Sequence, residues 1–166
     1  MKLYVNEKIF SLHNKFYVKD ENDMDVYEIS SKVFSIGDKT TINDMQGNKV
    51  AYIEQEIFHL TPNYNIYIGE QFAFKITKKF QLFKNDYVLS NGYRVEGGFM
   101  MLDFAVFDDK NNQIGSITRK FISIGDKYEI TIDDVSKKEI VLAIIVAITN
   151  DVNRSQSSSN STVNIN

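Results

Sequence analysis

The chain contains no cysteine, no tryptophan and a single proline, Pro62. Without cysteine it can form no disulfide, use no thiol nucleophile, and bind no zinc or iron–sulfur cluster through thiolates. Disulfides are common in small secreted domains, so their exclusion favours a reducing compartment.

The sequence also has no apolar run long enough to cross a bilayer. The longest such run, Ile140–Ile148, has nine residues, whereas a spanning helix needs about 17–25. Charged residues interrupt the N-terminus before an apolar run of signal-peptide length can form, as in Met1–Lys8. We therefore expect a soluble, cytoplasmic protein with no transmembrane segment. The net charge of −3 gives no general attraction to nucleic acid, so no nucleic-acid partner is expected.

The composition favours a β-rich domain. Phenylalanine and tyrosine supply a 13% aromatic content in 166 residues, and both residue types pack well on pleated strands. Apolar and polar residues alternate in several segments, which predicts strands with one face in the core. The core-facing residues are Phe72, Phe74 and Ile76; Leu102, Phe104 and Val106; and Tyr128, Ile130 and Ile132. Turn residues separate these segments at short intervals, as in antiparallel barrels and sandwiches.

Two parts of the sequence repeat each other. When residues 16–42 are aligned with residues 104–130, a shift of 88, eleven of 27 positions are identical. The block Ser-Ile-Gly-Asp-Lys occurs at Ser35–Lys39 and again at Ser123–Lys127. Its glycine permits a positive φ and its aspartate can bond its own backbone, so we interpret each block as a tight turn. Each copy then contains three strands, and the two copies predict two similar halves of one closed sheet.

The apolar run near the C-terminus is predicted to be a helix buried in the core. Ser136 and Glu139 have the spacing of a capping box, and Asp133 and Asp134 lie upstream, where the helix dipole favours negative charge. The predicted helix extends from about Lys137 to Thr149. A helix that is apolar on all sides has to be enclosed by protein.

The composition changes after Asn150, where serine and asparagine dominate. Such a polar, low-complexity segment is typical of disorder. We predict one domain over residues 1–151 and a disordered tail over residues 152–166.

No catalytic constellation is recognisable. The two histidines, His13 and His59, are not part of any known nucleophile motif. The adjacent acids Asp108-Asp109 and Asp133-Asp134 are interpreted as turn and cap residues, because neighbours on a strand point to opposite faces. No glycine-rich phosphate loop occurs. We therefore predict no catalytic residue, no metal site and no cofactor, and a protein that is not an enzyme.

The remaining candidates for a binding site are basic. One group belongs to a single predicted hairpin, and the other precedes the second repeated turn. These residues are Lys75, Lys78 and Lys79 in the hairpin, and Arg119 and Lys120 before the turn. They could contact phosphates of a lipid headgroup or another anion. The alternative is that they are solvated outward faces of strands, balanced by nearby acids such as Glu70 and Asp86.

Several motifs together resemble the LURP-one-related family. They are, in order, Asp44–Ile53, Leu60–Tyr67, Gly125–Ile130 and the apolar C-terminal segment. The resemblance covers the chain from Tyr4 to Asp151 and depends on the order of the motifs. It implies the tubby C-terminal-like fold, a mainly β structure in which a closed antiparallel barrel of about twelve strands surrounds one hydrophobic C-terminal helix. Closure also removes the exposed sheet edges that so many strands would create.

The resemblance does not define an activity, because one fold can support many functions. The leading hypothesis is a non-enzymatic binding or scaffold domain of the LURP-one-related type whose ligand and protein partner are unknown. A second hypothesis is peripheral binding of anionic phospholipid or phosphoinositide headgroups, which the tubby proteins of the wider fold bind. A third is an enzyme with an unrecognised carboxylate or histidine site, for which a pocket joining His13 or His59 to buried acids would be the support.

Overall fold

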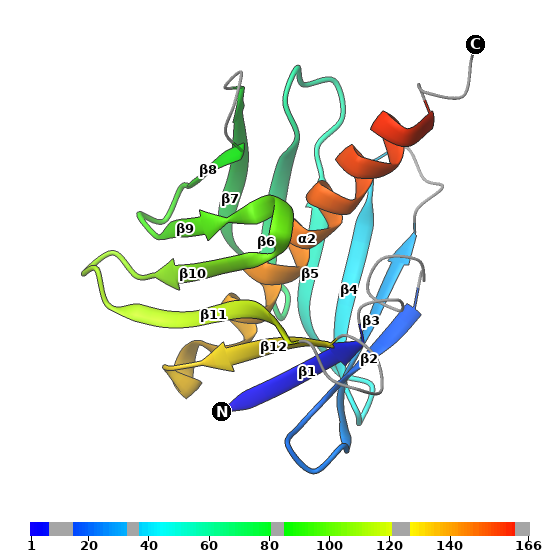
Figure 1. Cartoon of the computed structure of the whole chain (residues 1–166), viewed down its shortest axis with the longest axis vertical. Coiled ribbons are helices and arrows are strands. Elements are labelled where there is room, and N and C mark those ends of the chain that lie inside the picture. Colours follow the sequence, from blue (N-terminus) through cyan, green and yellow to red (C-terminus); the bar gives the residue numbers. More distant parts are fainter. Residues whose placement is uncertain (7–14, 33–36, 81–84, 121–126, 162–166) are drawn as a thin grey trace.

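In the part of the chain that the structure describes, twelve antiparallel strands form one curled sheet around one long helix (Figure 1). The computed structural model describes residues 1–6, 15–32, 37–80, 85–120 and 127–161. In chain order the strands are β1 (Lys2–Asn6), β2 (Lys15–Lys19), β3 (Asp25–Lys32), β4 (Lys39–Asp44), β5 (Lys49–Gln55), β6 (Asn63–Ile68), β7 (Gln71–Phe80), β8 (Asn85–Leu89), β9 (Arg94–Gly98), β10 (Asp103–Phe107), β11 (Gln113–Lys120) and β12 (Lys127–Ile132). The helical elements are the short 3₁₀ turns η1 (Phe99–Met101) and η2 (Val135–Lys137), and helix α2 (Lys138–Ser161).

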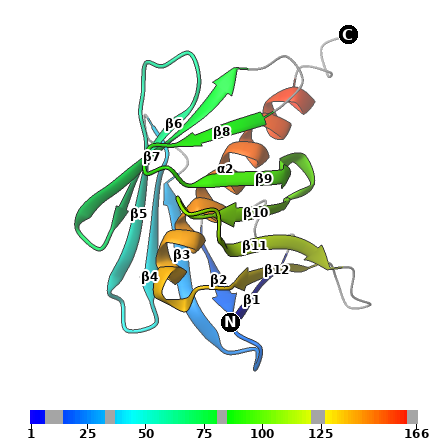
Figure 2. The same ribbon diagram turned by 90° about the vertical axis from the view of Figure 1, so that its left-hand side faces the viewer.

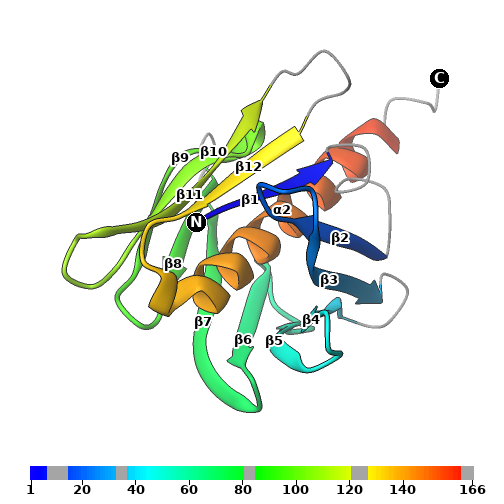
Figure 3. The same cartoon turned by 90° about the horizontal axis from the view of Figure 1, so that it is seen from below.

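The sheet is a meander that nearly closes into a barrel. Each strand pairs with the next along the chain from β1 to β8 and from β9 to β12, and β1 also pairs with β12. Strands β8 and β9 are the two edges of the sheet. The predicted fold, a twelve-stranded barrel around a buried C-terminal helix, is confirmed, with the ring nearly rather than fully closed. Figure 3 shows α2 running through the inside of the ring.

The meander gives the barrel two different ends. Consecutive antiparallel strands are connected at alternate ends, so the connections divide into two sets. We call the end with the β2–β3, β4–β5, β6–β7, β8–β9 and β10–β11 connections the turn end; α2 begins there. We call the other end the loop end; α2 finishes there, on the same side of the molecule as the β5–β6 connection (Figure 2), and Arg154 of α2 donates to Gln55 at the end of β5.

The predicted alternation is confirmed for most inward positions. Phe74, Ile76, Phe104 and Ile130 are all at most 3% exposed. Phe72 is the exception, with 56% of its surface exposed. Ile66 pairs with Phe74 but Tyr67 pairs with Phe72, so a bulge at the intervening residue turns Phe72 to the outer face.

The internal repeat is confirmed strand by strand. Strands β2, β3 and β4 become the bounds of β10, β11 and β12 when 88 is added to each residue number. The turns also match. The carboxylate of Asp20 accepts hydrogen bonds from the backbone of Asn22 and Met24, and that of Asp108 accepts them from Lys110 and Asn112. The two halves therefore share local geometry as well as sequence.

The repeated Ser-Ile-Gly-Asp-Lys blocks lie largely outside the described residues, namely at 35–36 and 123–126. In the first copy, Gly37 has a φ of +82°, as expected for a turn glycine. The Asp38 side chain differs from the prediction, because it forms an ion pair with Arg154 of α2. It therefore ties the β3–β4 connection to the helix.

The start of α2 corrects the predicted capping box. The backbone N–H and the hydroxyl of Ser136 both donate to Asp134, at 3.0 and 2.6 Å. Asp134 is thus the N-cap, in this case of η2, and α2 follows from Lys138. Because the Ser136 amide is already bonded to Asp134, Glu139 does not complete the capping box.

The end of α2 also differs from the prediction. The helix continues past Thr149 to Ser161, through the first part of the segment predicted to be a disordered tail. Asp151 and Val152 are each 1% exposed, so packing against the barrel extends the helix beyond its apolar run. Residues 162–166 lie outside the described part of the chain.

Candidate binding surface

The interior of the barrel is occupied by α2. Every residue from Val141 to Ile148 is at most 1% exposed. The helix approaches β11 closely at Gly115, where a Cβ atom would lie 2.5 Å from Cγ1 of Val141. The apolar run is therefore core.

A buried polar cluster joins α2 to the sheet near the loop end. Tyr64 and Tyr87 donate hydroxyl hydrogen bonds to the carboxylate of Asp151, at 2.9 and 2.7 Å, and the Lys78 ammonium lies 2.7 Å from it. Burial, together with the Asp151 charge, raises the pKa of both tyrosines far above its usual value. The cluster is internally paired, and it fixes the angle at which α2 leaves the core.

The five predicted basic residues do not form one anion site. Lys78 points inward to Asp151. Arg119 lies two residues after the buried Ile117 on the same strand face, and its Nε is buried. Lys75 pairs with Glu56 at 2.7 Å.

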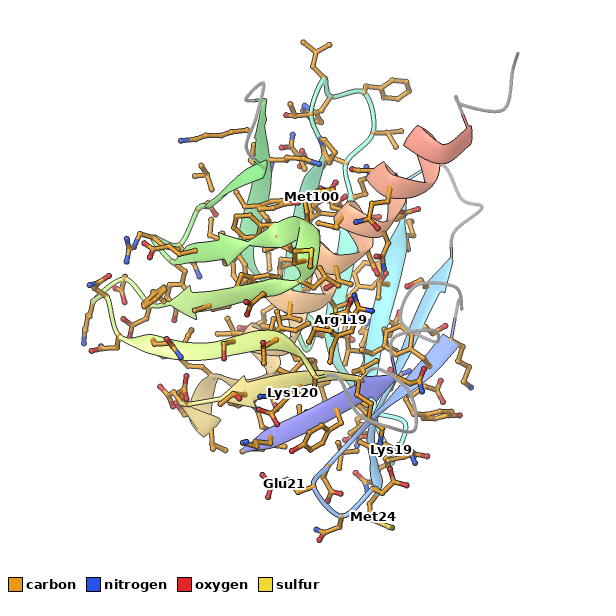
Figure 4. All side chains as sticks on the ribbon, in the orientation of Figure 1. Lys19, Glu21, Met24, Met100, Arg119 and Lys120 are labelled. Carbon is orange, nitrogen blue, oxygen red and sulfur yellow. The ribbon has the colours of Figure 1, made fainter. Side chains whose placement is uncertain are left out.

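The other two predicted residues are exposed and far apart in the strand order. Lys120 lies 3.7 Å from Glu129, and Lys79 forms no ion pair with any residue that the structure describes. Strand β7, which carries Lys79, lies next to one edge of the sheet, and β11 lies near the opposite edge. Figure 4 shows Arg119 and Lys120 together on β11.

Among the described residues, the two most exposed large apolar side chains lie in the β5–β6 connection. Phe58 and Leu60 have relative exposures of 96% and 106%, and Ile57 is also exposed. We call Ile57, Phe58, His59 and Leu60 the loop tip. It stands beyond the ends of its two strands (Figure 1). Isolated exposed apolar residues are common, but several on one protrusion mark an interaction site.

Specific contacts hold the base of this connection in place. The Glu56 N–H donates to the Asn63 carbonyl at 2.9 Å, and the Lys78 N–H donates to the Pro62 carbonyl at 3.0 Å. Hydrogen bonds from Lys75 and Asn65 hold the Glu56 carboxylate and lower its pKa. These hydrogen bonds fix the positions of the residues on both sides of the loop tip.

The one described histidine belongs to the loop tip. His59 Nε2 lies 3.0 Å from Glu56 Oε2, beside an open groove of about 440 Å³ lined in part by Glu54 and Asn65. The lowered pKa of Glu56 keeps it ionised, which makes it a weak general base. His13 lies outside the described residues. Within the described chain, no group of three histidine, aspartate or glutamate side chains could hold a metal ion.

Charge is distributed unevenly between the two ends. The connections of the turn end and the start of α2 are acidic; these residues are Asp20, Glu21, Asp23, Asp44, Glu70, Asp108, Asp109, Asp133 and Asp134. Cations gather at the strand ends of the loop end; these are Lys15, Lys39, Lys78, Lys79, Arg119, Lys120 and Lys127. Among them, Lys15, Lys39, Lys78 and Lys120 are ion-paired, with Glu28, Glu54, Asp151 and Glu129. The acids Asp38, Glu54 and Glu56 near the loop tip are each ion-paired, with Arg154, Lys39 and Lys75.

Sequence reasoning missed the loop tip. Its residues lie between two strands and just before Pro62, where no strand or helix pattern is present. The sequence signal that could have found it is a group of apolar residues in a connection beside a proline. A connection has no face packed on the core, so such side chains are expected to be exposed.

A nearly closed antiparallel barrel around a C-terminal helix is the architecture that the sequence motifs implied. The chain matches the LURP-one-related family over residues 1–149, and it belongs to that family. It is 27% identical over 153 residues to the uncharacterised protein YxjI of Bacillus subtilis, covering 92% of this chain and 93% of that protein. Its fold is similar to the X-ray structure of a protein from Arabidopsis thaliana, with a TM-score of 0.63 and 17% identity over 92% of this chain and 90% of that one.

Among the described residues, no helix combines the length and the apolar content that crossing a bilayer requires.

Proposed function

We propose that this protein is a non-enzymatic binding or scaffold domain that engages its partner through the loop tip. The observation that carries the proposal is the nearly complete exposure of Phe58 and Leu60 on a connection with a fixed base. Large apolar side chains that protrude into water have a favourable free energy of transfer to any apolar partner, about 1.5–3 kcal/mol each when fully buried.

The interior of the barrel supports a binding role rather than a catalytic one. Asp151, the most buried acid described, is occupied by two tyrosine hydroxyls and by Lys78. The Asp151 carboxylate, the two hydroxyls and the Lys78 ammonium bond to one another and hold α2 against the sheet, so this cluster offers no free acid–base pair to a substrate. The cytoplasmic location expected from the sequence stays a prediction, and it is consistent with the lack of cysteine.

A photo-cross-linking experiment tests the proposal without knowledge of the partner. Phe58 is replaced by p-benzoylphenylalanine in cells, and the matched control carries the same residue at Met45, which is 46% exposed in the β4–β5 turn of the opposite end. We expect adducts with protein or lipid from position 58 and few from position 45. Equal yields at the two positions, or no adduct at position 58, would contradict the proposal.

Of the two histidines considered for the enzymatic alternative, His59 is the one in the described chain. On the binding proposal, His59→Ala retains the fold and the cross-link yield at position 58, because the His59 side chain is about half exposed and Glu56 is its one polar partner within the described chain. Circular dichroism melting and the cross-linking assay measure both. A folded variant that still cross-links but no longer complements a deletion strain would favour an enzyme.

A further inference from the structure

We infer that the partner of the loop tip is an anionic lipid bilayer, into whose surface Phe58 and Leu60 insert. The inference rests on the proposed binding function of the loop tip and names its partner. Its apolar anchors, Phe58 and Leu60, are not among the basic residues predicted from the sequence, whereas Lys79 and Lys120, which contribute charge, are.

The loop tip is a convex protrusion, which suits a soft partner. Phe58 and Leu60 alternate with His59, whose side chain turns back to Glu56 at 3.0 Å. The two apolar side chains have relative exposures of 96% and 106%. An interfacial apolar segment buries such side chains among the headgroups and the first acyl carbons, with its polar atoms left in water.

The backbone holds Phe58 outward at a cost. Phe58 has a φ of +67°, in the left-handed region that a bulky side chain rarely adopts. Such strain persists where the surrounding structure imposes it and is concentrated at binding sites. Here the bonds from Glu56 to Asn63 and from Lys78 to Pro62 close the base of the connection. The tip therefore reaches a membrane already in its inserted conformation, which reduces the entropy lost on binding.

Charge favours one end of the barrel for approach to an anionic surface. At the turn end Asp23, Glu70, Asp108 and Asp134 are paired with lysines, whereas Glu21 and Asp109 form no ion pair within the described chain and are repelled by an anionic bilayer. The loop end carries cations on several different strands, among them Lys79 on β7 and Lys120 on β11. Because these cations are spread around the rim, they fit a broad anionic plane better than a single phosphate. Each basic residue near such a surface contributes to attraction within about a Debye length.

Vesicle flotation tests the inference on the full chain. Vesicles of phosphatidylcholine alone are compared with vesicles that also contain phosphatidylglycerol. We expect binding to the anionic vesicles, weaker binding to the neutral ones, and loss of the difference in high salt. The double variant Phe58→Ser/Leu60→Ser should bind anionic vesicles at least about tenfold more weakly, since two inserted side chains are removed.

Two controls separate the loop tip from general surface effects. Met24→Ser/Met45→Ser removes two exposed apolar side chains from the turn end and should leave binding unchanged. Lys79→Glu should reduce binding several-fold in low salt, whereas Lys110→Glu at the turn end should not. All four sites are exposed, so each variant is expected to fold, which melting curves verify.

The outcomes distinguish this inference from the proposed function. If the protein does not bind anionic vesicles in low salt, or if the Phe58→Ser/Leu60→Ser variant binds as well as the unchanged chain, the bilayer inference is wrong. A protein adduct from position 58 in cells would in that case still support the proposed binding function, with a protein as the partner. Absence of any adduct would overturn both.

Discussion

At the scale of single residues, Asp20 and Asp108 occupy equivalent positions in the repeat but have different surroundings. Both hold a turn by accepting backbone hydrogen bonds. Only Asp108 also binds a lysine of the helical segment, with Lys137 Nζ 2.9 Å from its Oδ2. That contact connects the second half of the barrel to the start of α2.

The Asp108 contact predicts a pH dependence of stability. The hydrogen bond from Lys137, and then those from Asn112 and Lys110, hold the pKa of Asp108 well below its ordinary value. A group whose pKa is lower in the folded state stabilises above its unfolded pKa, here about 4. That stabilisation is lost as the pH falls toward the folded pKa.

We therefore expect Asp108→Asn to lower the free energy of unfolding at pH 7. Between pH 4 and pH 2, the free energy of unfolding of this variant should fall less than that of the unchanged chain. Urea denaturation at a series of pH values measures this. Asp20→Asn is the matched control: it keeps the turn but has no lysine partner, so its pH profile should stay closer to that of the unchanged chain. Identical profiles for the two variants would show that Lys137 adds nothing.

Gly115 gives a steric prediction at the same scale. A Cβ atom there would lie 2.5 Å from Val141 Cγ1 and 2.8 Å from the Thr131 carbonyl oxygen. Both contacts are too close, so β11 or α2 must shift in Gly115→Ala. Overpacking of this kind costs roughly 1–3 kcal/mol. Thermal melting measures it, with Gly47→Ala as a control where no neighbour lies within 4 Å and only backbone strain applies.

At the scale of elements, the polar cluster around Asp151 fixes the second half of α2 to β6, β7 and β8. Asp151→Ala would leave the buried Tyr64 and Tyr87 hydroxyls and the Lys78 ammonium without their acceptor. Breaking a buried charge pair by removal of one partner costs about 3–5 kcal/mol.

We expect the Asp151→Ala loss to appear as a lower midpoint in urea denaturation. Asp109→Ala, at an exposed turn, should change the midpoint little. Lys78→Met in the Asp151→Ala background should recover part of the loss, because it removes the unpaired charge. If the double variant is no more stable than Asp151→Ala, the charge is not the main cost.

At the scale of the whole molecule, the helix is the core around which the sheet curls. Ile144 is fully buried on α2, and an ammonium there has no partner. An unpaired buried charge costs several kcal/mol, comparable with the total stability of an ordinary domain, about 5–15 kcal/mol.

Ile144→Lys is therefore expected to prevent folding. Gln156→Lys on the same helix, at an exposed position, should fold normally. Far-ultraviolet circular dichroism and gel filtration compare the two. A stable, monomeric Ile144→Lys protein would show that the helix is not the core.

Several features followed from the sequence alone because their causes are local. Alternation placed Phe74, Phe104 and Ile130 in the core, and the repeat located six of the strands. The apolar run Ile140–Ile148 is too short for a helix that crosses a bilayer, so its length alone excluded that interpretation. In each case the relevant interactions are with near neighbours in the chain, or with a core that any fold must provide.

The remaining features depended on which strands become neighbours, and only the tertiary structure decided them. Asp151 looked like the edge of a disordered tail, but its partners are about 60–90 residues away in sequence. Lys78 looked like part of an anion site, yet the strand register turns it inward to that carboxylate. Phe58 and Leu60 are exposed because the core of the barrel is filled by other side chains and the β5–β6 connection lies beyond it. Burial and charge pairing across the barrel are long-range, so the chain itself determined the strands and the core helix, and their assembly determined which apolar and charged side chains are exposed.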